Sequence, residues 1–175
     1  MRKPIITVRM IVHVGLMVAL TVILHMFRLY HMPQGGSITL GGMLPLLFLA
    51  YAYGPIGGYL GGFVYGLINL LQDPYILHPI QVLFDYPLPY MALGLAGYFK
   101  TKPLLGAVVG CSGRLFCHFI SGAVFFASYA PPDMSPYWYS FVFNATYLVP
   151  ELLICLLFLI VLPTNRLIHQ MTVGK

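Results

Sequence analysis

Long apolar stretches separated by short polar segments dominate the sequence. A membrane-spanning helix needs about 20 mostly apolar residues. Six stretches approach or reach this length, at residues 5–27, 38–53, 55–71, 79–99, 103–127 and 137–162. The segments between them are rich in Gly, Pro and polar residues, which interrupt helices. The pattern predicts an all-α integral membrane protein, a bundle of six transmembrane helices that occupies residues 1–175 as a single domain.

The composition supports a membrane location. Hydrophobic residues make up 59% of the chain and charged residues only 7%, whereas soluble domains carry about 25% charged residues. The net charge of +5 does not indicate nucleic-acid binding, because the basic residues form no continuous stripe. The three cysteines, Cys111, Cys117 and Cys155, fall inside apolar stretches, where packing thiols are more common than metal ligands or disulfides.

The distribution of basic residues predicts the orientation. Both ends of the chain and the linker near residue 101 hold seven of the nine basic residues: Arg2, Lys3, Arg9, Lys100, Lys102, Arg166 and Lys175. Because Lys and Arg accumulate on the cytoplasmic side, both termini are expected to be cytoplasmic. The loops at 28–37, 72–78 and 128–136 then face outward, as a ligand entrance would.

Small residues on two helices indicate close helix packing. Gly58, Gly62 and Gly66 recur every four residues on the third span, which predicts internal packing against another helix backbone. Gly15 and Ala19 form a similar patch on the first span. Its spacing fits an internal neighbour and another subunit equally well.

Four ionisable residues lie within the spans, where each needs a partner or a function: Asp85, Arg114, His118 and Glu151. Counted along their helices, Arg114 and Glu151 lie roughly 16 and 18 Å from the cytoplasmic ends. Opposite charges at matching depth on consecutive antiparallel helices predict a structural ion pair. A direct contact with a ligand, or a proton relay, is the alternative.

A second polar layer lies nearer the outer surface. Asp85, Asn144 and His118 lie roughly 9, 10 and 13 Å from the outer ends of their helices, and Gln81 precedes Asp85 by one turn. Many aromatic residues surround this layer in the sequence. A carboxylate among aromatic faces and amide groups suits a flat organic cation. The alternative is an interfacial aromatic belt in which Asp85 bonds His118.

Motifs of other function classes are missing from the sequence. It contains no phosphate-binding loop, no zinc-protease motif and no nucleophile elbow. Residues 1–90 and 91–175 show no convincing internal similarity of the kind common in secondary transporters. The sequence therefore predicts a protein that is not an enzyme, needs no cofactor and does not bind ATP by a phosphate-binding loop.

Four segments resemble one family of membrane proteins. The segments at 32–37, 78–86, 118–126 and 139–146 are similar to those of the thiamine-specific S component of energy-coupling-factor (ECF) vitamin transporters. The resemblance covers nearly the whole chain. It implies a six-helix subunit in the plasma membrane of a prokaryote that binds thiamine from outside. It also implies a transmembrane coupling protein and two ATPases as partners. A related ligand, such as the pyrimidine precursor of thiamine, is the close alternative, and an autonomous transporter or channel the distant one.

The resemblance also implies the residues of the ligand site. Asp85 corresponds to the acidic residue that holds the aminopyrimidine, and Phe126 to a stacking aromatic position that is Trp in some members. The other implied binding residues are Tyr75, Tyr86, His118, Tyr139, Asn144, Gln34 and Ser37. Gln34 and Ser37 replace Trp and Glu of some members, so the first loop departs most from the family pattern. Gly15 and Ala19 correspond to the small-residue motif that meets the coupling protein.

Overall fold

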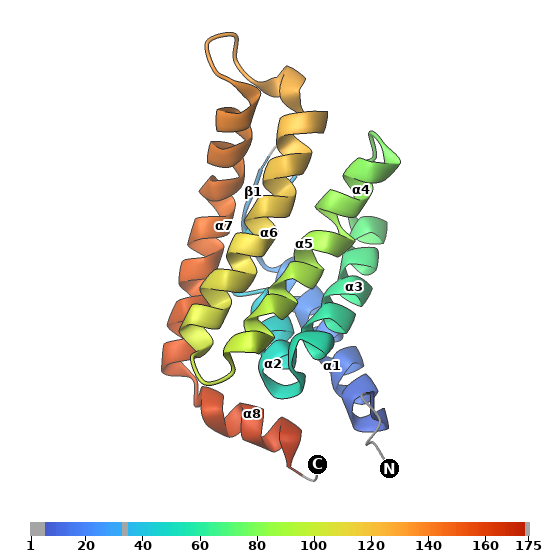
Figure 1. The fold of residues 1–175 in the computed structure, drawn as a ribbon, viewed down its shortest axis with the longest axis vertical. Coiled ribbons are helices and arrows are strands. Elements are labelled where there is room, and N and C mark those ends of the chain that lie inside the picture. The colour runs from blue at the N-terminus through green and yellow to red at the C-terminus, as the bar shows by residue number, and fades with distance from the viewer. Residues whose placement is uncertain (1–5, 33–34, 174–175) are drawn as a thin grey trace.

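The computed structural model describes residues 6–32 and 35–173, which fold into a helical bundle with one short hairpin (Figure 1). In chain order the elements are α1 (Val8–Met26), β1 (Arg28–His31), β2 (Ser37–Thr39), α2 (Leu44–Tyr53), α3 (Pro55–Gln72), α4 (Pro79–Asp85), α5 (Pro87–Ala92), the 3₁₀ helix η1 (Leu93–Phe99), α6 (Pro103–Phe125), the 3₁₀ turn η2 (Ala127–Tyr129), α7 (Pro136–Val161) and α8 (Thr164–Thr172). The fold is mostly helical, as the apolar stretches predicted.

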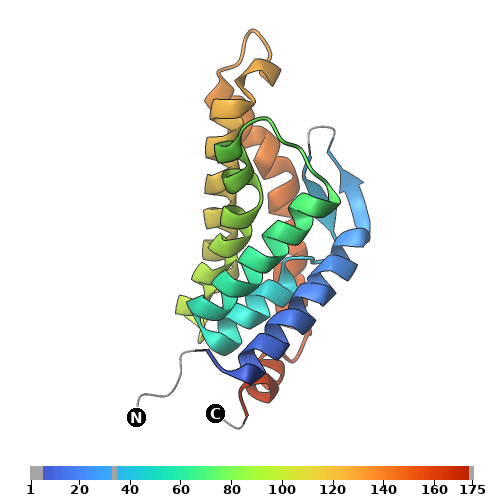
Figure 2. The ribbon, with the colours of Figure 1, turned by 90° about the vertical axis from the view of Figure 1, so that its right-hand side faces the viewer.

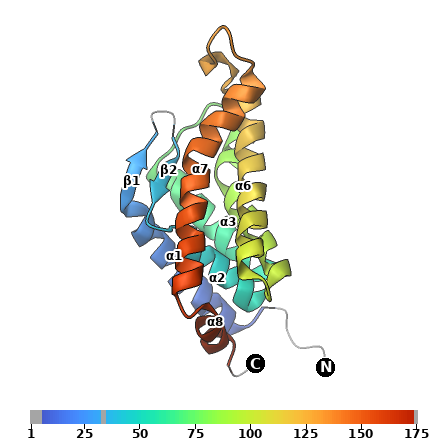
Figure 3. The ribbon, with the colours of Figure 1, turned by 90° about the vertical axis from the view of Figure 1, so that its left-hand side faces the viewer.

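The bundle has two distinct ends. The two longest helices, α6 and α7, stand side by side and are joined by the loop at the upper end in Figure 1. The hairpin of β1 and β2 lies toward this upper end, beside α7 (Figures 2 and 3). The first turn of α1 and all of α8 lie at the lower end, where α8 crosses beneath the other helices. Four predicted stretches, those at 5–27, 55–71, 103–127 and 137–162, are confirmed as the helices α1, α3, α6 and α7.

The second predicted stretch is only partly helical. Its first residues form β2, and α2 begins at Leu44 rather than at residue 38. Gly41 has a φ of 80°, a backbone conformation that favours glycine, and it separates the strand from the helix. The shortened helix is the centre of the core, since every residue from Leu44 to Ala52 is buried.

The fourth predicted stretch is broken into three pieces. Residues 79–99 form α4, α5 and η1 instead of one continuous helix. Pro87 and Pro89 explain the break, because proline lacks the backbone N–H of a helical hydrogen bond and clashes with the preceding turn. The break at Tyr86 leaves α4 at an angle to α5 in Figure 1. The hairpin and α8 are further elements that the hydrophobic pattern did not predict.

The glycines of α3 bring this helix against the broken segment. A Cβ atom on Gly58 would lie 2.4 Å from the Cα atom of Gly94, and one on Gly62 would lie 2.2 Å from the Tyr90 carbonyl oxygen. A Cβ atom on Gly66 would lie 2.6 Å from the Cα atom of Pro87. No side chain larger than hydrogen fits these contacts, so the predicted internal packing role of the three glycines is confirmed.

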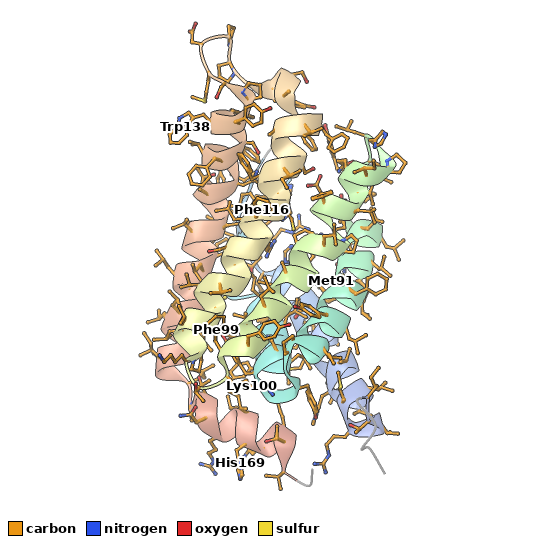
Figure 4. All side chains as sticks on the ribbon, in the orientation of Figure 1. Met91, Phe99, Lys100, Phe116, Trp138 and His169 are labelled. Atoms are coloured by element: carbon orange, nitrogen blue, oxygen red, sulfur yellow. The ribbon has the colours of Figure 1, made fainter. Side chains whose placement is uncertain are left out.

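The outer surface of the bundle is apolar. Among the described helices, α1, α6 and α7 are long and apolar enough to cross a membrane, and α2 is a shorter apolar helix. Large apolar side chains such as Phe116 and Trp138 point outward along α6 and α7 (Figure 4). Lys100 and His169 lie near the lower end in the same view. A surface of this kind is stable against lipid rather than water.

Candidate ligand-binding site

A cavity of about 200 Å³ lies between α6, α7, α4 and the hairpin. One face of α6 supplies Arg114, His118, Gly122 and Phe126, which recur every four residues and therefore share one side of the helix. The facing side of α7 supplies Tyr139, Ser140, Phe143, Asn144 and Tyr147. The two helices approach closely beside the cavity, since a Cβ atom on Gly122 would lie 2.2 Å from the Ser140 hydroxyl oxygen.

Eight predicted ligand residues line this one cavity: Ser37, Tyr75, Asp85, Tyr86, His118, Phe126, Tyr139 and Asn144. The ninth, Gln34, lies outside the described residues. The structure thus brings together residues from the hairpin, the α3–α4 loop, α4, α6 and α7. Their roles in ligand binding stay a prediction.

Asp85 presents a carboxylate that neighbouring side chains hold in place. One oxygen accepts a hydrogen bond from the Gln81 amide at 2.6 Å, and the other lies 3.5 Å from Nδ1 of His118. The carboxylate side chain is only 18% exposed. No Lys or Arg pairs with it among the residues that the structure describes. The site therefore offers an acidic group with no strong cationic partner of its own.

Gln81 holds the Asp85 carboxylate and the α3–α4 loop in position. Its amide nitrogen donates to Asp85 and to the Tyr75 carbonyl oxygen at 2.9 Å. Its amide oxygen accepts from the Leu77 backbone N–H at 2.9 Å and closes the capping box of α4. The side chain is fully buried, so both of its N–H donors are already used within the protein.

His118 and Asn144 connect α6 to α7 beside Asp85. The Asn144 amide donates to the Ser140 carbonyl oxygen at 2.8 Å and to the His118 carbonyl oxygen at 3.3 Å, while its oxygen accepts from the Tyr147 hydroxyl at 2.8 Å. Nε2 of His118 is buried and has no hydrogen-bond partner within the described chain. A buried polar atom without a partner is costly.

An aromatic cluster lies at the loop end of the cavity. The Tyr75 and Phe126 rings stack with centroids 5.6 Å apart, and Phe126 also contacts Tyr129 at 6.0 Å. The hydroxyl groups of Tyr75 and Tyr129 are 2.7 Å apart, which links the α3–α4 loop to the α6–α7 loop. On α7, Tyr139 stacks with Phe143 at 5.9 Å. These faces suit a flat cationic ring by stacking and cation–π contact.

Tyr86 and Ser37 hold loops against the cavity. The Tyr86 hydroxyl donates to the Asp73 carbonyl oxygen at 2.8 Å and accepts from the Tyr75 backbone N–H at 2.7 Å. Ser37 is buried in β2, with its hydroxyl oxygen 2.9 Å from Nδ1 of His31. At the base of the hairpin, Arg28 forms an ion pair with Asp73 at 3.0 Å. These contacts fix the position of Tyr75 and of the hairpin.

The predicted ion pair between Arg114 and Glu151 is wrong as a direct contact. Glu151 is buried and accepts hydrogen bonds from the backbone N–H and, at 2.6 Å, from the hydroxyl of Thr39 in β2. The Arg114 guanidinium instead lies over the Tyr90 ring, 4.5 Å from its centroid, with a weak hydrogen bond of 3.4 Å to the Tyr90 hydroxyl. Within the described residues no carboxylate forms an ion pair with Arg114.

Several lining residues were not predicted as part of the site: Arg114, His25, Asn69, Tyr90 and Tyr147. The four-residue spacing on α6 could have placed Arg114 with His118, and Tyr147 lies one turn after Phe143. His25 on α1 and Asn69 on α3 come from other elements, and no spacing in the sequence connects them with Asp85. Arg114 lines the deep part of the cavity, three turns below Phe126 along α6.

The predicted subunit patch is separate from the cavity. Gly15 and Ala19 are exposed on α1, and a Cβ atom on Gly15 would meet nothing within 4 Å. Neither residue lines the cavity. The patch is therefore open to a partner helix, which leaves its predicted role in subunit contact intact as a prediction.

Comparisons with known proteins identify related transporters. A model of the thiamine transporter protein family matches residues 11–170. The thiamine transporter ThiT of Bacillus subtilis is 32% identical over 171 residues, covering 87% of this chain and 88% of that protein. ThiT of Lacticaseibacillus paracasei is 28% identical over 123 residues, covering 59% of this chain and 61% of that protein.

A solved structure has the same fold. ThiT from Listeria monocytogenes superposes with a TM-score of 0.81 at 22% sequence identity, over 91% of this chain and 96% of that chain. This likeness shows that the two chains share the same overall fold. The family model covers most of the sequence, and an identity of 32% extends over nearly the full chain. The chain belongs to the thiamine transporter family.

Proposed function

We propose that this chain is the thiamine-binding S component of an ECF-type transporter in a bacterial plasma membrane. The observation that carries the proposal is the meeting of Asp85, His118, Asn144 and the aromatic cluster in one cavity. Family membership supports thiamine as the ligand, since the related Bacillus subtilis protein is named a thiamine transporter. The chain captures its ligand and is not an enzyme.

The cavity chemistry matches the two rings of thiamine. The Asp85 carboxylate accepts a hydrogen bond from the amino group of the aminopyrimidine, and His118, which lines the same cavity, lies beside that ring. The thiazolium ring carries the positive charge and stacks among Tyr75, Phe126 and Tyr129. Ligand burial also removes aromatic surface from water, which adds hydrophobic free energy.

The chain crosses the membrane six times in this proposal. The spans are α1, α2, α3, the broken segment α4–α5–η1, α6 and α7, with both termini in the cytoplasm. The basic residues near the α8 end, Arg9, Lys100, Lys102 and Arg166, support this orientation. The cavity then opens toward the outside, at the end that holds the hairpin and the aromatic cluster.

Uptake requires partner subunits. The sequence contains no phosphate-binding loop, so ATP hydrolysis is assigned to two ATPase subunits, joined through a transmembrane coupling protein. The coupling protein docks on the exposed Gly15 and Ala19 face of α1, where small side chains permit close helix contact.

Ligand titration of the purified, detergent-solubilised protein tests the proposal. We expect one thiamine per chain and clearly weaker binding of the pyrimidine precursor, because the precursor has no thiazolium to stack on Phe126. Equal affinity for the two compounds would show that the site recognises only the pyrimidine part. If neither compound bound, the proposed thiamine-binding function would be wrong.

A further inference from the structure

A second hollow lies near the opposite end of the molecule from the hairpin. It is an apolar groove of about 420 Å³ lined by residues of α1, α2 and α8 and by Leu162 at the end of α7. Figure 3 shows α8 at the lower end of the bundle, beneath α2. Met17, Leu20 and Leu24 of α1, Phe48 of α2, and Leu167 and Met171 of α8 line it. Only His13 and Gln170 bring polar side chains to it.

Hydrogen bonds hold α8, which forms the lower wall of the groove, to the rest of the bundle. The Tyr53 hydroxyl donates a hydrogen bond of 3.0 Å to the Met171 carbonyl oxygen of α8 and contacts Nδ1 of His13 on α1. Met171 is itself buried against the bundle. The end of α8 is therefore held to α1 and α2, and the groove is part of the folded structure.

Basic residues flank the lower end of the groove. On α1, Arg9 precedes the lining residue His13 by one turn, so both lie on the same face. On α8, Arg166 precedes the lining residue Gln170 by one turn. Both arginines are exposed.

No acidic residue opposes these charges. The four acidic residues of the chain are Asp73, Asp85, Asp133 and Glu151, and none belongs to α1, α2 or α8. The lower end therefore attracts anions.

The groove is distinct from the proposed subunit patch. At 100° per residue, the lining positions 13, 17, 20 and 24 cluster on one side of α1, and Gly15 and Ala19 lie on the other side. A partner helix docked on the small-residue patch would leave the groove open to lipid.

We infer that the groove binds an anionic phospholipid of the cytoplasmic leaflet, with one acyl chain among the apolar side chains and the headgroup phosphate between Arg9 and Arg166. The distance from His13 to Leu24 along α1 is about 16 Å, which matches one leaflet of a hydrocarbon core about 30 Å thick. The apolar channel thus has about the length of one leaflet, and Arg9 and Arg166 each lie one turn before a lining residue at its lower end.

Native mass spectrometry of the purified protein tests the inference. Equal amounts of dioleoylphosphatidylglycerol and dioleoylphosphatidylcholine are added, and the ratio of the two single-lipid adducts is measured. We expect a clear preference for phosphatidylglycerol. Replacing both arginines (Arg9→Gln with Arg166→Gln) should reduce that preference about thirtyfold, since each basic side chain near a membrane surface contributes about 1 kcal/mol, or about fivefold.

Three further variants test whether the effect is specific to the groove. Lys100→Gln with Lys102→Gln removes the same charge from the same end, away from the groove, and should leave the preference unchanged. Leu20→Trp fills the groove and should abolish the retained lipid, whereas Ala19→Trp on the opposite face of α1 should not. Thermal unfolding confirms that each variant is folded.

Three results would overturn the inference: no preference for phosphatidylglycerol, an equal loss in the lysine variant, or retention of lipid by a folded Leu20→Trp protein. A cross-link from a Leu20→Cys variant to another membrane protein would also overturn it, by assigning the groove to a protein partner.

Discussion

The two halves of α6 show how one helix serves both packing and binding. A single face of the helix carries a residue every four positions: Gly106, Gly110, Arg114, His118, Gly122 and Phe126. In the lower half, Cβ atoms on Gly106 and Gly110 would each lie 3.0 Å from a carbonyl oxygen of η1, so the helices are in backbone contact. In the upper half the same face lines the cavity. The difference teaches that one stripe of a helix packs against η1 through Gly106 and Gly110 and lines the cavity where it carries Arg114, His118 and Phe126.

Arg114 marks the boundary between these halves. Below it, Gly106 and Gly110 bring α6 against η1; above it, His118 and Phe126 face the cavity, while Gly122 keeps α6 close to α7. Its guanidinium lies on the Tyr90 ring, and Nε has no hydrogen-bond partner within the described residues. Glu151, on the adjacent helix, holds the hairpin.

The largest effect is expected from removing the hairpin anchor. Glu151→Leu leaves the Thr39 N–H and hydroxyl without acceptors, and each buried unsatisfied group costs about 1–3 kcal/mol. We expect a loss of about 3 kcal/mol in the free energy of unfolding, measured by thermal unfolding in detergent. Glu151→Gln retains an acceptor for the Thr39 N–H and should recover part of the loss. An unchanged melting temperature in Glu151→Leu would show that Thr39 does not depend on this carboxylate.

A somewhat smaller effect is expected from enlarging the packed half of α6. Gly110→Leu forces a side chain against the Leu93 backbone, and overpacking of this kind costs about 1–3 kcal/mol. We expect a lower melting temperature. Thiamine affinity of the protein that remains folded should change little, because Gly110 does not line the cavity. If affinity fell as strongly as stability, the two halves would not be independent.

The acidic residue of the open half should control affinity. Asp85→Asn removes the negative charge but keeps the shape, so thiamine binding should weaken at least tenfold, or about 1.4 kcal/mol. The melting temperature without ligand should stay near that of the original protein, since the amide can still bond Gln81. Calorimetric titration with thiamine measures the change, and an unaltered Kd would exclude Asp85 from ligand recognition.

The smallest effect on binding is expected at the outer face of α1. Ala19→Trp blocks the small-residue patch, which lies outside the cavity. Ligand binding by the isolated chain should stay the same, while thiamine uptake by the chain assembled with its partners should be lost. Thiamine accumulation by proteoliposomes that contain only this chain, driven by an ion gradient, would replace the subunit assignment with a secondary transporter.

The sequence predicted helices well where one apolar stretch was uninterrupted, as in α1, α3, α6 and α7. It failed where backbone chemistry overrides hydrophobicity. Pro87 and Pro89 break the fourth stretch, and Gly41 separates β2 from α2. Both breaks have sequence signals that the hydrophobic average conceals. The hairpin itself was not predictable from periodicity, because strands of four and three residues are too short to show alternation.

The site was predictable in its upper layer and not in its lower one. Counting helix depth placed Asp85, His118 and Asn144 at similar levels, and all three line the same cavity. The same counting paired Arg114 with Glu151, because depth does not show which way a side chain points. Glu151 instead bonds Thr39, a residue of the unpredicted hairpin. Because the hairpin was not predicted, Glu151 was assigned to Arg114 instead of Thr39.

A crystal structure of the protein grown with thiamine tests the central claim most directly. The account predicts one thiamine in the cavity between α4, α6 and α7, with its amino group on the Asp85 carboxylate and its thiazolium against Phe126. The groove between α1, α2 and α8 should contain no thiamine. Thiamine outside the cavity, or within it but with the thiazolium against Arg114, would contradict the account.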